Sequence, residues 1–134
     1  MAASSAGLHE DEHKLQVATI DRHRAITSIM EELEAVDWYD QRVDAATDEE
    51  LKGILAHNRD EEKEHAVMAL EWLRRRDPKL DEHLRTYLFT TKSVLEIEDE
   101  QKGQEVGSPA PSGNTSATGT GDLGIGSLRE GNSA

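Results

Sequence analysis

Three residues of the chain have the types and the spacing needed to hold a metal ion. Glu62 and His65 stand three positions apart, which places a carboxylate and an imidazole on one face of a helix. Glu32 lies earlier in the chain, and each of the three interrupts a stripe of apolar residues that repeats at helical spacing. A charged group on such a stripe is costly to bury without a partner, and carboxylate and imidazole groups are common metal ligands. Glu32, Glu62 and His65 therefore form a candidate metal-binding set.

Two long helices are needed to bring these residues together. Apolar periodicity predicts one helix from about Leu8 to Ala46. A capping box at Thr47 and Glu50 predicts that a second helix starts there, and it is expected to end before Asp77. Glu32 lies 14 residues before Ala46 (46 − 32) and Glu62 lies 16 residues after it (62 − 46). At ~1.5 Å per residue, both carboxylates stand about 21 to 24 Å from the turn of an antiparallel hairpin, so they should meet at one level.

The rest of the chain divides into a shorter helical part and a polar tail. Asp77 followed by Pro78 is typical of a helix start, and Ser93 with Glu96 predicts a brief acidic helix that ends near Lys102. We therefore expect a helical domain over residues 1–102. Residues 103–121 are mostly Gly, Ser, Thr, Ala and Pro and predict a flexible linker. Apolar residues return in the last segment, 122–134, at Leu123, Ile125 and Leu128.

The candidate ligand set is half of a known arrangement. Helical bundles that hold two iron ions use one Glu from each of two helices and a Glu-x-x-His pair from each of two others. This chain offers one copy of each pattern, and a two-fold symmetric dimer would supply the second copy. The predicted fold is all-α: an antiparallel two-helix hairpin plus a short C-terminal helix, forming half of a ferritin-like four-helix bundle that dimerisation completes.

Composition excludes several classes of protein. The formal net charge is −13, which argues against a nucleic-acid partner. The chain has no cysteine, so disulfides, thiolate metal sites and iron–sulfur clusters are excluded. It has neither a signal-peptide pattern nor an apolar run long enough to cross a membrane, so the expected location is the cytoplasm.

Other residues near Glu32 each have two possible roles. Glu31 and Glu34 share a helix face with Trp38, and this acidic face is either simply solvated or gathers hydrated cations for an inner site. Tyr39 lies on the same stripe as Glu32. It is either a packed aromatic residue or a hydrogen-bonding or redox-active neighbour of the site.

Four segments of the chain resemble the encapsulated ferritins, the ferritin-like cargo proteins of encapsulin nanocompartments. The resemblance rests on RHRAITSIMEELEAVDWYDQRVDA, LAHNRDEEKEHAVMALEWLRRRD, HLRTYLFT and the terminal GDLGIGSLRE, which is similar to an encapsulin-targeting peptide. For the site, the resemblance implies that Glu32, Glu62 and His65 are ferroxidase ligands, with Glu62 bridging two irons across a subunit interface. It implies that Glu31 and Glu34 form a site where metal ions enter, that Trp38 lies beside them, and that Tyr39 lies near the di-iron centre.

The resemblance also implies an activity and partners. The family oxidises iron(II) to iron(III) with oxygen, assembles as a homo-oligomeric ring of dimers, and leaves mineral storage to the surrounding shell. The chain is then expected in the cytoplasm, inside the lumen of an encapsulin nanocompartment, attached through Leu123, Ile125 and Leu128. Two alternatives remain from the residues alone: a non-catalytic metal-binding cargo or adaptor protein that uses zinc or manganese to fasten a dimer, and a metal-free helical module that binds a partner.

Overall fold

The computed structural model describes residues 7–107, and over this range the chain is helical and contains no strand. A 3-10 turn at Glu12–Lys14 is followed by helices α1 (Val17–Ala45), α2 (Glu49–Arg74), α3 (Pro78–Tyr87) and α4 (Val94–Gly107). The predicted all-helical class is confirmed. The expected linker segment and the tail with Leu123, Ile125 and Leu128 lie almost wholly outside the described residues. No helix within residues 7–107 has the length and apolar character that crossing a bilayer requires.

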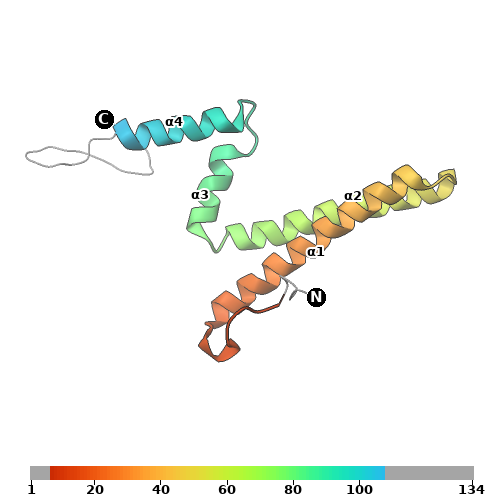
Figure 1. The fold of residues 1–134 in the computed structure, drawn as a ribbon, viewed down its shortest axis with the longest axis horizontal. Helices are drawn as coiled ribbons and strands as arrows, with labels where there is room; N and C mark the ends of the chain where they lie inside the picture. The colour runs from red at the N-terminus through yellow and green to blue at the C-terminus, as the bar shows by residue number, and fades with distance from the viewer. Residues whose placement is uncertain (1–6, 108–134) are drawn as a thin grey trace, which may run out of the picture. The chain divides into compact units, whose positions relative to one another are not determined.

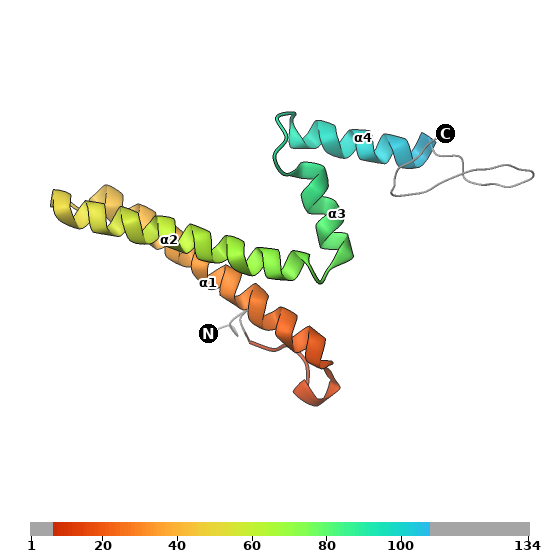
Figure 2. The same cartoon turned by 180° about the vertical axis from the view of Figure 1, so that it is seen from behind.

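Helices α1 and α2 form the predicted hairpin. They run in opposite directions, lie close together near their tight connection and diverge toward their far ends in both views (Figures 1 and 2). The turn that joins them is short, since Ala45 ends one helix and Glu49 begins the next. This antiparallel pair is the scaffold on which the candidate metal ligands stand.

The start of the first long helix differs from the sequence prediction. The helix was expected from about Leu8, but α1 begins at Val17. Before it, the Asp11 side chain accepts a hydrogen bond from the backbone N–H of His13, and Leu15 is extended. A side chain that bonds its own local backbone offers the chain an alternative to the α-helix.

The cap of α2 lies one residue later than predicted. Asp48 is the N-cap, and its Oδ2 accepts a hydrogen bond from the backbone N–H of Leu51 at 2.8 Å, so the Thr47 capping box was a wrong prediction. Both residue types cap helices well. The carboxylate of Asp48 has the additional advantage of a negative charge at the positive end of the helix dipole.

An ion-pair network occupies the end of α2 and the start of α3. The Arg74 guanidinium donates to both carboxylate oxygens of Glu71 at 2.7 Å and also to Asp81. Arg75 donates to Glu71 Oε2 at 2.7 Å as well. These two guanidinium groups lower the pKa of Glu71 to about 2. The α3 cap is as predicted, because the backbone N–H of Leu80 donates to Asp77 Oδ1 at 3.0 Å just before Pro78.

Helix α4 is longer than expected. The backbone N–H of Leu95 donates to Ser93 Oγ at 3.2 Å, which confirms Ser93 as the start of this element. The helix was expected to end near Lys102 but continues to Gly107. A pair between Lys102 Nζ and Glu98 Oε2 at 3.4 Å, one helical turn apart, lies in the turn before the added residues. Residues 103–107, expected as the start of the linker, are therefore helical.

The described residues have a very small core. Only Ala66, Leu73 and Ile97 are buried apolar residues within that range. Large apolar side chains of the hairpin lie exposed instead, among them Ile26, Met30, Leu33, Val67 and Met68. A pair of helices has too little depth to bury both apolar faces, so the hairpin by itself leaves much of its apolar surface in contact with water.

We expect the Asp48 cap to be measurable in stability. Changing Asp48 to Ala removes the acceptor for the Leu51 N–H and should lower the free energy of unfolding by about 1 kcal/mol, as for other N-cap residues. Urea denaturation followed by circular dichroism would measure this. Thr47→Ala is the matched control, since Thr47 lies next to the cap, and an equal loss in both variants would contradict the assignment.

Candidate metal centre

Glu32, Glu62 and His65 meet at one level of the hairpin, as their positions in the sequence predict. Glu32 comes from α1, whereas Glu62 and His65 come from adjacent turns of α2. Each offers one ligand atom, and these atoms all lie within 4.8 Å of one another. The Nδ1 atom of His65 is 3.0 Å from Glu62 Oε1 and 3.8 Å from Glu32 Oε1. One ion placed among the three atoms could contact a side chain from each helix.

The two carboxyl groups affect each other's ionisation. The adjacent Glu62 carboxyl raises the pKa of Glu32, and the adjacent Glu32 carboxyl lowers the pKa of Glu62. The hydrogen bond to Glu62 also raises the pKa of His65. A metal cation bound beside them would supply the positive charge that stabilises two carboxylates close together.

The site is open on one side. The side chains of Glu32, Glu62 and His65 are 29%, 24% and 46% exposed. Three ligand atoms leave unfilled positions around an ion of ordinary coordination number, and those positions are accessible from outside the hairpin. Hard carboxylate oxygens together with one imidazole nitrogen suit iron, whose two oxidation states accept both ligand types.

A hollow in the hairpin surface adjoins the ligands. It is formed along the seam between α1 and α2, and Glu32 and His65 contribute to its wall. Its lining residues come from both helices: Asp21, Arg24, Ala25, Ser28, Glu32, His65, Met68, Ala69 and Trp72. The Trp72 ring is covered on one face by the guanidinium of Arg76, 4.0 Å from the ring centre. The hollow is thus lined by apolar and polar side chains beside the three candidate ligands.

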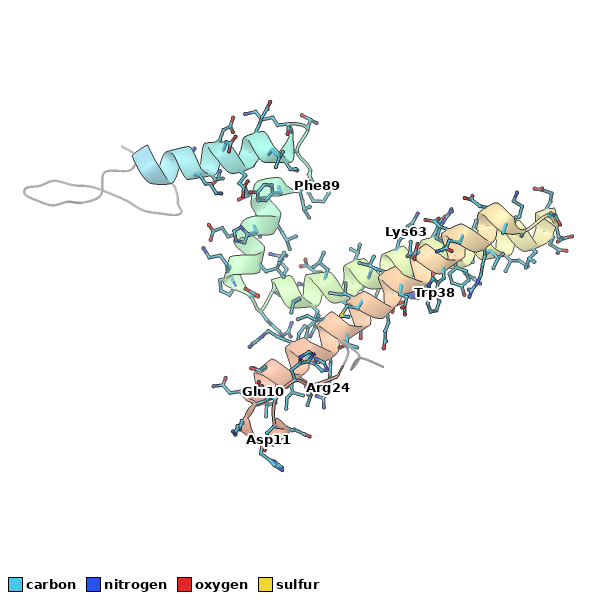
Figure 3. The ribbon with its side chains drawn as sticks, in the orientation of Figure 1. Glu10, Asp11, Arg24, Trp38, Lys63 and Phe89 are labelled. Carbon is cyan, nitrogen blue, oxygen red and sulfur yellow. The ribbon has the colours of Figure 1, made fainter. Side chains whose placement is uncertain are left out.

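The other predicted site residues lie outside the three-residue cluster. Glu31, Glu34 and Trp38 are exposed, and within the described residues they belong to no group of three metal-ligating side chains. Figure 3 shows Trp38 pointing away from the hairpin, on the opposite side from Lys63. Tyr39 is half-buried, and the Arg42 guanidinium lies 5.4 Å from its ring centre. The roles expected for these four residues stay predictions.

Two features of the site were not predicted from the sequence. The first is an ion pair across the seam, in which Arg59 of α2 donates to Asp40 of α1 at 3.0 Å and helps to fix the alignment of the helices. The second is the hollow, to which Arg24 and Met68 contribute. Met68 follows His65 by three positions, and this spacing could have placed it on the ligand face.

A family model described as EncFtn-like matches residues 7–91 of the chain, a span that includes all three candidate ligands. The chain belongs to the EncFtn-like family. The resemblance noted in the sequence is thereby confirmed at the level of the family.

Relatives of this EncFtn-like chain are found in several bacteria. It is 62% identical over 130 residues to an "Encapsulated ferritin-like protein" of Rhodospirillum rubrum, covering 96% of this chain and 92% of the relative. It is 56% identical over 95 residues to a "Ferritin-like protein" of Thermotoga maritima, covering 71% of this chain and 83% of the relative. It is 34% identical over 106 residues to the "Encapsulin nanocompartment cargo protein EncC" of Myxococcus xanthus, covering 76% and 79% respectively.

A solved structure supports the fold. The crystal structure of protein ne0167 from Nitrosomonas europaea superposes with a TM-score of 0.64 and is 61% identical in sequence. The match covers 66% of this chain and 97% of the other.

Metal binding should stabilise the chain through the three clustered residues. A ligand that binds only the folded state raises stability, by about 2.7 kcal/mol at 100 times its dissociation constant. Iron(II) added without oxygen should therefore raise the melting temperature of the wild type. The increase should disappear in Glu32→Gln, Glu62→Gln and His65→Ala. Without metal, Glu32→Gln should be no less stable than the wild type, since it removes one carboxylate that faces another.

Glu64→Gln is the matched control for this measurement. Glu64 lies beside His65 in the sequence but is exposed and outside the three-residue cluster. Its variant removes the same unit of charge from the same turn of α2, so it should keep the metal-dependent increase. A similar increase in all of the variants would show that iron(II) binds elsewhere.

Proposed function

We propose that the chain is a ferroxidase, which oxidises iron(II) to iron(III) with oxygen at a di-iron site shared between two copies. The observation that carries this proposal is the convergence of Glu32, Glu62 and His65 within 4.8 Å at the hairpin seam. It amounts to half of the ligand set that di-iron helical bundles use.

A second copy completes the site in this proposal. Two hairpins related by a two-fold axis bring together four helices, two carboxylates from α1 and two Glu-x-x-His pairs from α2. The same contact covers the exposed apolar side chains along the ligand face, such as Met68 and Ile54. Self-association and metal binding then stabilise each other, because each requires the surface that the other organises.

The residues have distinct tasks in this reaction. Iron(II) is the substrate, and two ions give up one electron each to one oxygen molecule. In this proposal Glu62 would bridge the two ions, as the resemblance to the encapsulated ferritins implies. Glu32 and His65 would be further ligands of these ions. The carboxylates favour the harder iron(III) product.

The same proposal includes storage outside the chain. A hairpin of this size encloses no space for a mineral, so the iron(III) must leave for another compartment. Two relatives are named as encapsulated or as encapsulin cargo, and this supports a similar location for this chain, in the lumen of an encapsulin nanocompartment in the cytoplasm. We propose that Leu123, Ile125 and Leu128, which follow the polar segment, are the residues that bind the shell. Assembly as a ring of dimers belongs to the same proposal.

Iron oxidation should depend on the three clustered residues. Oxygen consumption and ferric absorbance after aerobic mixing should rise far faster with the wild type than by autoxidation. Glu32→Ala, Glu62→Ala and His65→Ala should each reduce the rate to that of autoxidation while far-ultraviolet circular dichroism stays nearly unchanged. Mass measured before and after iron(II) addition should shift to even-numbered oligomers.

Two results would contradict the di-iron assignment. One is a wild-type oxidation rate in all three variants. The other is a chain that binds iron tightly but stays monomeric, since a site within one chain needs no second copy. Metal-dependent association without oxygen consumption would favour the adaptor role instead.

The tail should direct the chain to its shell without affecting chemistry. Deleting residues 122–134 removes three apolar side chains that each contribute on the order of 1.5 to 3 kcal/mol when fully buried. Co-expression with an encapsulin shell protein should then yield empty shells, while iron oxidation by the purified truncated chain is unchanged. Equal encapsulation of the truncated and full chains would show that residues 122–134 do not target the chain to the shell.

A further inference from the structure

The hollow beside the candidate metal centre contains a side chain that the proposed reaction does not use. Met68 is 63% exposed and lines this hollow together with Glu32 and His65. It stands three residues after His65 on α2, so the two side chains project from neighbouring positions on one helix face. The thioether of methionine is readily oxidised by peroxides, in contrast to the carboxylates around it.

We propose that Met68 is a modification site, oxidised to methionine sulfoxide by hydrogen peroxide that forms at the adjoining centre. This inference rests on the proposed ferroxidase function. Two iron(II) ions lose one electron each, and oxygen gains two electrons and two protons to become hydrogen peroxide. The O–O bond of the peroxide then breaks; one oxygen forms an S–O bond with Met68 and the other leaves as water. The sulfur loses two electrons and the peroxide gains them.

The geometry favours Met68 as the first oxidisable group that the peroxide meets. The site is open toward the hollow, so a product that leaves on this side passes the residues that line it. Trp72, another oxidisable side chain of the hollow, has one ring face covered by Arg76. A second copy that closes over the hollow would confine the peroxide beside the Met68 thioether. The peroxide would then spend longer there than beside a methionine that faces bulk water.

Met30 provides an internal control. It is 39% exposed and stands two positions before Glu32 in α1. At 100° per residue it projects about 200° away from Glu32, and it does not line the hollow. Peroxide from bulk solution should therefore oxidise Met68 and Met30 roughly as their exposures of 63% and 39% allow, whereas peroxide from the centre should select Met68.

Oxidation of Met68 has a structural consequence. Sulfoxide formation replaces a flexible apolar side chain by a polar one and disrupts interfaces that bury methionine. The hollow lies on the face that a second copy must cover to complete the metal site. Oxidised Met68 should therefore weaken association, and methionine sulfoxide reductases could restore it. Met68 would thus couple peroxide production to the assembly of the protein.

The test compares two sources of peroxide on the full-length wild-type chain. In the first, the chain is loaded anaerobically with no more iron(II) than it binds and is exposed to oxygen with catalase in solution. In the second, the metal-free chain receives hydrogen peroxide directly, without catalase. Peptide mass spectrometry measures the added oxygen at Met68 and Met30. Glu32→Gln, treated with iron(II) and oxygen in the same way, is the site-disabled control.

The expected ratio of Met68 to Met30 oxidation during iron turnover is several times the ratio given by bulk peroxide. In Glu32→Gln, the ratio of Met68 to Met30 oxidation should fall to the value that added hydrogen peroxide gives. The inference would be overturned if the wild type oxidises iron rapidly but its ratio of Met68 to Met30 oxidation equals the ratio given by added hydrogen peroxide. The ferroxidase proposal would then still stand. Failure of the wild type to oxidise iron rapidly would overturn both.

Discussion

The contact between Glu32 and Glu62 across the hairpin seam is the constraint on which the candidate function depends. A carboxylate oxygen of each residue lies within 4.8 Å of the other, although the two come from different helices. Two like charges this close cost energy unless a proton or a cation lies nearby. A chain selected only for stability has no reason to keep this pair on a stripe that is otherwise apolar. The pair therefore favours the proposed metal site.

The alignment of the helices determines whether this contact forms. A shift of α2 by one residue along α1 would move Glu62 about 1.5 Å along the axis and rotate it away from Glu32. The short connection between Ala45 and Glu49, the Asp48 cap and the Arg59–Asp40 ion pair all act against such a shift. These three features hold the two helices in register although very little apolar surface is buried between them. The buried residues of α2 are Ala66 and Leu73.

Sequence periodicity was sufficient to predict the hairpin and the cluster of three ligands. Helix geometry is regular, so similar distances from one turn place Glu32 and Glu62 at about one level whatever the details of packing. Helix ends were predicted less well, because several neighbouring residues can act as caps. Thr47 and Asp48 are both good N-caps, and only the observed hydrogen bond to Leu51 distinguishes them. The start at Val17 likewise depends on local bonding by Asp11, which periodicity does not detect.

The hollow could not be predicted in the same way, because it depends on how both helices are rotated about their axes. Asp21, Ser28 and Met68 look like ordinary surface residues in the sequence, and they share a wall only after the seam has formed. The same rotation leaves the candidate ligands partly exposed, so the proposed chemistry would lie at a surface that a second copy could complete. The proposed metal binding, the proposed assembly and the proposed oxidation of Met68 therefore all depend on one geometric feature, the open seam between the two helices.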